Sequence, residues 1–318
     1  MARVSKALPG GLQVVLYHHL ADESDDLTHD LRVATPPALF EAHLRRLARD
    51  YDVVDLDQAL SGRLPRRALL ITFDDGYRSV VEVAGPILKR LGLPSVFFVS
   101  AAFVTPGSLP LDNLLCWLVR TIGVETVEQA VTGRPARGRT LAALLGVIAE
   151  LPYARRVRLA DELAEAFGVD RARLRQESGL FLDYGELPRL ADFACEVGNH
   201  TRSHLFCRAI VDEAAGEVEL VQHKRQLEEW VGAPVRAFSY PYGHRRDATP
   251  LVERLLAASG HRATFLVESR PNTRHRAGAT WNRVSLQDRP VSRLGVELEL
   301  LPRLRAVKDL LPPASAHR

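Results

Sequence analysis

The chain has 318 residues, of which 46% are hydrophobic and 25% charged, as in an ordinary globular protein, and barrels of this size often form one domain. The net charge of +3 is small and the many arginines are spread among acidic residues, so we expect no nucleic-acid surface. The sequence has no apolar run of about 18 residues, the length that a transmembrane helix needs, so we expect no membrane span. The first nine residues lack the apolar core of a signal peptide, and the three cysteines form an odd, sparse set, so we expect a cytoplasmic protein.

Strand-like and helix-like segments alternate along most of the chain. Alternation of this kind predicts a parallel sheet or an α/β barrel. Candidate functional residues follow several of the strands, and such barrels build their sites at the C-terminal strand ends. The predicted strands are 12–17, 53–56, 68–73, 95–100 and 235–238, and the predicted helices carry Leu39 to Leu47, Val83 to Leu91, Val218 to Leu227, and Leu251 to Leu256 before Gly260.

The pattern changes between Phe103 and about Tyr184, where the sequence predicts a helical insertion at about 104–184. Leucines at helical spacing indicate helices around 114–119, 141–148 and 159–167, and 133–138 is typical of a loop. The insertion could serve packing alone, or it could form a lid or wall for substrate. We expect the barrel domain to span 10–300, followed by a loose tail at 301–318.

Two adjacent carboxylates, Asp74 and Asp75, follow the apolar run 68–71 and precede Gly76. Neighbouring side chains in a strand point to opposite faces. At a bending strand end, with glycine free to adopt an unusual φ, both can reach one pocket. Two like charges placed together need a cation or a shared proton.

Two histidines, His200 and His204, could supply that cation's remaining ligands. On a helical turn, residues four apart lie on the same face and can share a metal. Two imidazoles and one carboxylate leave positions open for water and substrate, as in hydrolytic zinc enzymes. Taken alone, the spacing also fits a histidine pair without metal, but the Asp pair favours the metal site.

A third element is the turn at 240–243, Tyr-Pro-Tyr-Gly, which follows the apolar segment 235–238. Proline fixes φ and glycine frees it, so the turn is predicted to be rigid. It could be an ordinary aromatic loop, or it could aim a backbone N–H at a developing oxyanion.

These motifs, in this order, resemble those of the polysaccharide deacetylases of carbohydrate esterase family 4, the NodB-like deacetylases, over about residues 10–290. Their first motif is matched by Thr72 to Gly76, their second by His200, Thr201 and His204, and their third by Tyr240 to Gly243. The resemblance implies a distorted (β/α)7 barrel, a fold of the α/β class. It also implies catalytic and substrate-binding roles that are, in this chain, Asp74 as base, Asp75, His200 and His204 as metal ligands, the Tyr242 N–H as oxyanion donor, and Tyr240 and Pro241 at the substrate.

The chain departs from the commonest layout in its general acid. Many members carry that histidine in a late Leu-x-His motif, but His261 and His275 lie among polar, arginine-rich residues. The early strand instead ends in Tyr17-His18-His19, which resembles circularly permuted members, and this implies His18 as the acid, with His19 as a substitute. His18 could also simply end a core strand. The late Asp-Trp motif has no clear match, although the stretch 281–284, Trp-Asn-Arg-Val, lies near its place.

The sequence therefore predicts a metal-dependent hydrolase that removes an N-acyl group, in the first place acetyl, from an amino sugar, glycan or glycosylated metabolite. The donor types favour Zn²⁺ as the divalent metal ion and also fit Co²⁺ or Ni²⁺. Alternatives are a small-metabolite deacetylase or deformylase of the same fold and a catalytically silent glycan-binding barrel. A glycosidase is disfavoured, because its two carboxyl groups must flank the bond at about 5 Å or more, whereas Asp74 and Asp75 are adjacent.

Overall fold

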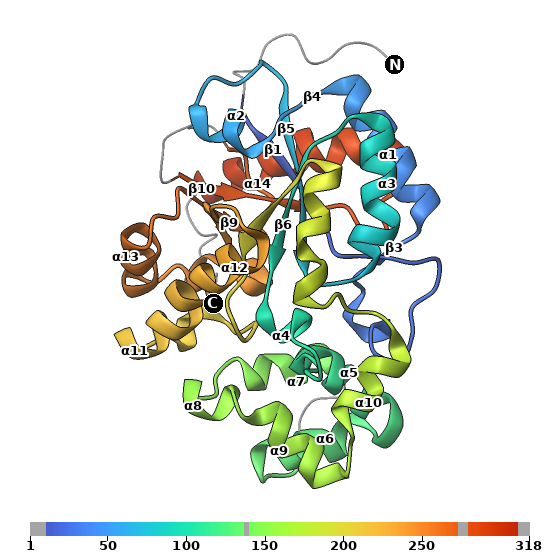
Figure 1. The fold of residues 1–318 in the computed structure, drawn as a ribbon, viewed down its shortest axis with the longest axis vertical. Coiled ribbons are helices and arrows are strands. Elements are labelled where there is room, and N and C mark those ends of the chain that lie inside the picture. The colour runs from blue at the N-terminus through green and yellow to red at the C-terminus, as the bar shows by residue number, and fades with distance from the viewer. Residues whose placement is uncertain (1–10, 137–139, 273–278, 311–318) are drawn as a thin grey trace, which may run out of the picture.

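The protein is described by a computed structural model over residues 11–136, 140–272 and 279–310. A parallel sheet lies at its centre with helices around it (Figure 1). The strands are β1 (Gln13–Tyr17), β2 (His19–Leu20), β3 (Ala34–Thr35), β4 (Asp52–Val53), β5 (Ala68–Asp75), β6 (Ser95–Val99), β7 (Cys195–Asn199), β8 (Ala237–Ser239), β9 (Ala263–Leu266), β10 (Ala279–Asn282) and β11 (Val284–Ser285).

The order of the central sheet shows how the barrel nearly closes. Its strands follow the order β10-β9-β8-β7-β6-β5-β1-β11, with β4 also paired to β5, while β2 and β3 form a separate pair. Only Arg283 separates β10 from β11. The segment 279–285 thus pairs with β9 through its first half and with β1 through its second half. The predicted distorted (β/α)7 barrel is confirmed, and the first strand of the chain lies beside the last.

The core has an inner and an outer layer, as expected when both faces of a parallel sheet are covered. All eight residues of β5 are buried. Ala68 and Leu70 join the apolar cluster that includes Phe98, Phe265 and Trp281. The alternate residues of β5, 69, 71 and 73, instead join the larger cluster that contains residues of the surrounding helices. This strict alternation fixes the face to which the side chains near the end of β5 point.

The four helices predicted outside the insertion are all present, but one predicted strand is shorter than expected. The predicted strand 53–56 ends at Val53, because Asp55 caps a short helix through a reciprocal capping box with Gln58. The helical segments before β6 and after β7 are η1 (His29–Leu31), α1 (Pro37–Asp50), α2 (Leu56–Ser61), η2 (Val80–Ala84), α3 (Gly85–Leu91), η4 (Cys207–Ala209), α11 (Glu213–Gly216), η5 (Glu217–Gln222), α12 (His223–Val231), η6 (Pro241–Gly243), η7 (Arg245–Asp247), α13 (Pro250–Ala258), η8 (Val291–Arg293), η9 (Val296–Leu300) and α14 (Leu301–Leu310).

The insertion lies between β6 and β7, and its helices from residue 111 to residue 178 gather at one end of the barrel, at the bottom of Figure 1. The sequence predicts three of its helices, around 114–119, 141–148 and 159–167, and misses the others. Among those missed is 171–178, whose stretch RARLRQES has almost no apolar face. Of the predicted loop 133–138, residues 137 and 138 lie outside the described residues. The helices between β6 and β7 are α4 (Ala101–Val104), α5 (Leu111–Ile122), α6 (Val124–Thr132), α7 (Leu141–Ile148), α8 (Tyr153–Arg156), α9 (Leu159–Phe167), α10 (Arg171–Ser178) and η3 (Tyr184–Phe193). The last of them, η3, packs against α3 and α12 on the barrel.

The expected loose tail is helical over its first ten residues as α14, and 311–318 lie outside the described residues.

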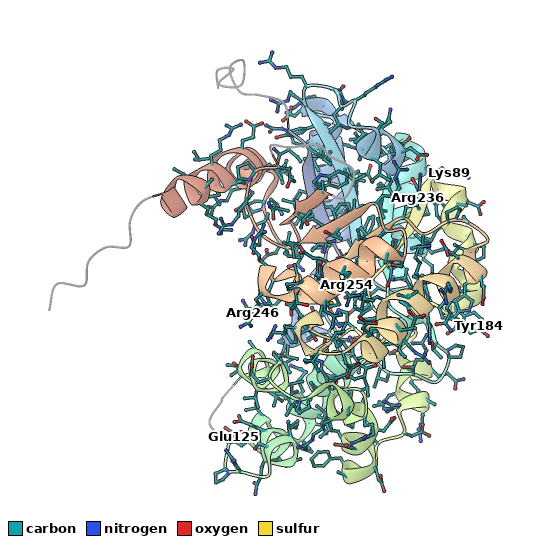
Figure 2. All side chains as sticks on the ribbon, turned by 90° about the vertical axis from the view of Figure 1, so that its left-hand side faces the viewer. Lys89, Glu125, Tyr184, Arg236, Arg246 and Arg254 are labelled. Carbon is teal, nitrogen blue, oxygen red and sulfur yellow. The ribbon has the colours of Figure 1, made fainter. Side chains whose placement is uncertain are left out.

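Many surface arginines have acidic partners: Arg254 lies 2.9 Å from Glu213, and Arg236 lies 2.6 Å from Glu196 (Figure 2). Within the described ranges, no helix is both long enough and apolar enough to span a bilayer.

Candidate metal centre and active site

The candidate residues meet at the C-terminal ends of the parallel strands. Asp74 and Asp75 end β5, His200 follows β7, and His18 follows β1. All four of these side chains line one cavity of about 780 Å³, together with His204. Strand ends of a parallel barrel converge on one edge, which explains why residues far apart in sequence meet here.

The bend at the end of β5 separates the two carboxylates. Asp75 itself adopts a positive φ of 84°, whereas Gly76 does not, so the sequence-based assignment of the unusual φ to Gly76 is wrong. Gly76 is instead required for space, since a Cβ there would lie 2.5 Å from the Cβ of Phe103. The bend thereby brings Asp75 into the same cavity as Asp74.

The segment 200–204 is a loop and not the predicted helical turn. Thr201 and His204 have positive φ values of 61° and 49°. Glu219 holds the loop from behind, accepting hydrogen bonds of 2.9 Å from both the N–H and the hydroxyl of Ser203. The two imidazoles therefore converge through a strained loop, with ring centroids 5.1 Å apart.

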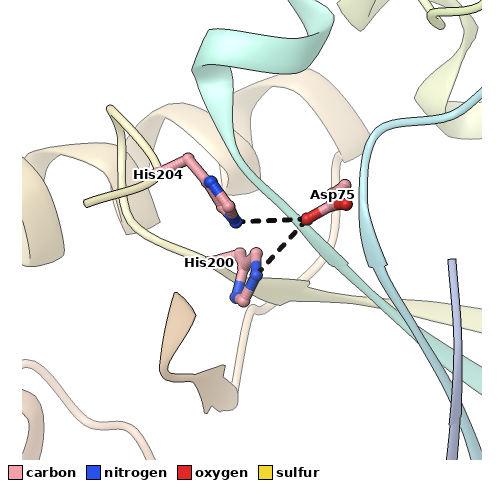
Figure 3. Close-up of side chains that lie close together, drawn as sticks. All are labelled: Asp75, His200 and His204. Atoms are coloured by element: carbon pink, nitrogen blue, oxygen red, sulfur yellow. Dashed lines mark ion pairs between the residues drawn. The ribbon is translucent and has the colours of Figure 1, made fainter. Parts of the chain in front are cut away.

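Asp75, His200 and His204 form a cluster suited to a metal ion. One ligand atom from each lies within 4.8 Å of the other two. Nε2 of His204 is 3.2 Å and Nε2 of His200 is 3.6 Å from the same oxygen, Oδ1 of Asp75 (Figure 3). Three converging nitrogen and carboxylate donors match the ligand set of a catalytic zinc site.

The second nitrogen of each imidazole supports this assignment. Nδ1 of His200 is 2.8 Å from the carbonyl oxygen of Ser239, and Nδ1 of His204 is 2.9 Å from Oδ2 of Asp112. Both partners accept hydrogen bonds, so Nδ1 carries the hydrogen and Nε2 is left to bind a metal. Metal-bound histidines are usually held in this way.

The electrostatic setting separates the three donors. Burial raises the pKa of Asp75, but His204, with smaller contributions from His18 and His200, outweighs it and the pKa falls to about 2. Burial lowers the pKa of His200 to about 4. Burial also lowers the pKa of His204, but Asp112 and Asp75 raise it to about 10. The centre is thus rich in negative charge beside His204, which favours a cation.

Asp74 has a different partner. Its two oxygens each lie 2.6 Å from a different guanidinium nitrogen of Arg283, which is fully buried. Burial raises the pKa of Asp74, but the guanidinium outweighs it and the net shift is downward. Sequence reasoning missed Arg283; the only signal was an arginine in the stretch 281–284, near the place of the family's Asp-Trp motif.

The histidines at the start of the chain separate in the structure. His18 lines the cavity, and its Nδ1 lies 3.3 Å from the side-chain nitrogen of Gln287. His19 hydrogen-bonds Ser79 at 2.9 Å, is buried, and does not line the cavity, so it is poorly placed as a substitute acid. His261 lies elsewhere, bonded to Asn199 and Ser259, and His275 lies outside the described residues.

The turn at 240–243 contributes only one residue to the cavity. Tyr242 lines it and has a positive φ of 60°. Tyr240 is fully buried in an apolar cluster with Phe238 and Leu266, and Pro241 is also buried. Neither lines the cavity, so the expected contact of Tyr240 and Pro241 with substrate finds no support in the geometry.

The insertion forms the remaining wall of the cavity. Asp112 and Asn113 come from α5, and Leu141 and Leu145 from α7. Much of this wall and its rim is aliphatic, with Leu31 and Val33 on the barrel side. The sequence does not single out Asp112, because one aspartate near the start of a helix carries no distinguishing signal.

The chain resembles known proteins in sequence and in structure. The family model described as "Polysaccharide deacetylase" matches residues 61–110 and 178–261. The gap between these segments falls within the insertion. The matched ranges contain Asp74, Asp75, His200, His204 and Tyr242, whereas His18, Asp112 and Arg283 lie outside them. A search of curated proteins gives no significant match.

Several solved structures share the fold. The Streptococcus pyogenes deacetylase PplD superposes with a TM-score of 0.58 at 13% identity, covering 92% of this chain and 100% of that one. IcaB from Ammonifex degensii gives 0.56 at 20%, covering 91% and 97%. A de-N-acetylase from Aggregatibacter actinomycetemcomitans gives 0.57 at 15%, covering 87% and 95%. At these identities the likeness establishes the barrel fold.

Proposed function

Because the chain belongs to the polysaccharide deacetylase family, we propose that it is a metal-dependent hydrolase that removes an N-acyl group, in the first place acetyl, from an amino sugar or glycan. One observation carries the proposal: the donor atoms of Asp75, His200 and His204 converge within 4.8 Å beside the buried Asp74–Arg283 pair. The structures of similar fold include proteins described as deacetylases, which supports the same reaction class.

The residues divide the chemistry among them. Asp75, His200 and His204 would hold a divalent cation, Zn²⁺ being favoured by the donor types and Co²⁺ or Ni²⁺ also fitting. Such a cation, when bound, polarises the amide carbonyl and makes water more acidic. Asp74, kept ionised by Arg283, accepts the proton of the attacking water.

Two further groups complete the reaction. The backbone N–H of Tyr242 would donate a hydrogen bond to the developing oxyanion. Two observations support this role: Tyr242 lines the cavity, and its backbone adopts an unusual positive φ at the turn. His18 would protonate the departing amine nitrogen, which is a poor leaving group without an acid. His18 lines the cavity that Asp74 also lines.

The experiment combines metal analysis with turnover. Purified protein reloaded with Zn²⁺ is assayed for release of acetate or formate from N-acetylglucosamine oligomers, a nucleotide-linked N-acetylhexosamine and an N-formyl sugar. Asp74→Asn is expected to keep the metal and lose roughly 100-fold or more in kcat, because a base is removed and no ligand is. His200→Ala is expected to lose the metal. Near-normal kcat in Asp74→Asn, or equal metal content in His200→Ala and wild type, would overturn the assignment.

The aliphatic wall favours a second candidate, a deacetylase or deformylase acting on a small metabolite. Leu141 and Leu145 of the insertion line the cavity together with Leu31 and Val33, and these side chains would suit an apolar group on the substrate. Faster turnover on short substrates bearing an apolar group than on long oligomers would select this candidate. Sugar binding without acyl release from any substrate would instead indicate a silent glycan-binding barrel.

A further inference from the structure

The helical insertion reaches the metal centre through one carboxylate. Asp112, the second residue of α5, is 6% exposed and lies 2.9 Å from Nδ1 of His204. The hydroxyl of Tyr242 donates to the same carboxylate, at 2.9 Å from Oδ1 and 2.8 Å from Oδ2. One insertion residue thus contacts a metal-binding candidate and the turn that carries the proposed oxyanion donor.

The two histidines are held by different parts of the molecule. His200 donates to a backbone carbonyl at the end of β8, which belongs to the barrel itself. His204 has no such backbone partner for Nδ1 among the described residues, and its own backbone is in a strained conformation with φ at 49°. Its ring orientation therefore depends on the insertion.

The insertion also contacts Tyr242 through a second residue, Arg156. Nη2 of Arg156, at the end of α8, lies 3.1 Å from the Tyr242 hydroxyl, and its guanidinium lies 4.8 Å above the ring of Phe206. The Phe206 ring in turn stacks on Tyr242 at 3.7 Å. The path Arg156–Tyr242–Asp112–His204 begins in the insertion, crosses the barrel turn, returns to the insertion and ends at the metal centre.

The location of Asp112 suits a buried anion. It lies in the first turn of a 12-residue helix, where free N–H groups and the helix dipole favour negative charge. The carboxylate accepts hydrogen bonds from Nδ1 of His204 and from the Tyr242 hydroxyl, so its burial is compensated.

We propose that Asp112 is a positioning residue of the metal centre: it fixes the Nδ1–H form of His204 so that Nε2 faces Asp75, and it makes the insertion part of the catalytic apparatus. This inference goes beyond the proposed reaction and rests on it only for the presence of a metal. The insertion is accordingly an anchored wall of the active site, and not a lid that swings freely over it.

Metal affinity tests this directly, without substrate. Metal-free protein is titrated with Zn²⁺ against a chromophoric chelator. Removal of a carboxylate that holds a metal-binding histidine typically weakens affinity by about 10–100-fold, and we expect that loss in Asp112→Ala. Asp112→Asn keeps an acceptor oxygen of the same shape and should lie between Asp112→Ala and wild type. Asp161→Asn is the matched control, since Asp161 lies in the same insertion with its side chain 70% exposed.

The outcomes separate the two proposals. Wild-type affinity in both Asp112 variants overturns the positioning role and leaves the deacetylase proposal standing. Failure of the wild-type protein to bind any divalent metal overturns both. Should Asp112→Ala not fold, Asp112→Asn alone decides, with the melting temperature in chelator checked against Asp161→Asn.

Amide hydrogen exchange can distinguish a positioning role of Asp112 from a purely structural one. Adding Zn²⁺ to the wild-type protein should slow amide exchange in α5, because metal binding at His204 is linked to Asp112. In Asp112→Asn the slowing should shrink or vanish while the exchange of β5 still responds. Equal slowing of α5 in both proteins contradicts the coupling.

Discussion

Asp74 and Asp75 are neighbours in the chain but have different partners. Asp74 lies against the Arg283 guanidinium, whereas Asp75 faces two imidazoles. The positive φ of Asp75 produces this division, since it turns the second carboxylate out of the strand's alternation. A buried carboxylate paired with arginine stays ionised and fixed in orientation, as a proton acceptor requires.

The proposed role of His18 as general acid can be tested by comparing substrates with different leaving groups. We expect His18→Ala to lower kcat on an amide by roughly 10²–10⁴-fold, as for loss of a positioned acid. Metal content and thermal stability should change little, because His18 is only partly buried and its ring is hydrogen-bonded to the side chain of Gln287. An activated ester, whose leaving group needs no proton, should be hydrolysed almost normally. An equal loss on amide and ester would show that His18 is not the acid.

Arg283 should matter for stability as well as for turnover. In Arg283→Met the buried Asp74 carboxylate loses its counter-ion, and breaking a buried pair by removing one partner costs about 3–5 kcal/mol. Urea unfolding of the metal-free protein measures this loss. The double variant Arg283→Met with Asp74→Asn removes the uncompensated charge and should recover part of it. A double variant no more stable than Arg283→Met would mean that packing, and not charge, dominates at this position.

At the scale of elements, the sequence predicts regular segments well and connecting loops poorly. The strands around β5 and the helices α1 and α13 follow apolar periodicity, which is a local property of the sequence. The loop at 200–204 depends on Glu219 and on positive φ values, which no periodicity indicates.

The same distinction explains which parts of the site the sequence predicts. The Asp pair and the histidine pair are local motifs, so the sequence alone identifies Asp74, Asp75, His200 and His204 as candidates. Arg283 and Asp112 act only through tertiary contacts across 209 and 92 positions. A single arginine or aspartate carries no sign of such a contact, and only the folded arrangement of β10, β11 and α5 brings these groups to the site.

At the scale of the whole molecule, the three cysteines are all free and buried. Burial raises the pKa of Cys116 to about 11, of Cys195 to about 12, and of Cys207 further. Near pH 8 their reactive thiolate forms are therefore scarce, and reagent access is blocked. The folded protein should react very slowly with a thiol-specific chromogenic disulfide, and all three thiols should react at once in denaturant. Rapid reaction of one thiol in the native state would contradict the buried placement.

The segment that joins both edges of the barrel has a consequence for the order in which the enzyme is made. His18 and its partner Gln287 are 269 positions apart, and Arg283 lies on the closing segment beside β1. At about 5–20 residues per second, a ribosome needs roughly 10–50 s to pass from one to the other. For most of that interval the growing chain already carries Asp74, but the arginine that pairs with it in the folded core does not yet exist. The buried pairing of Asp74 with Arg283 can therefore form only after residue 283 has been synthesised, so we expect the proposed active site to be complete only when the barrel closes.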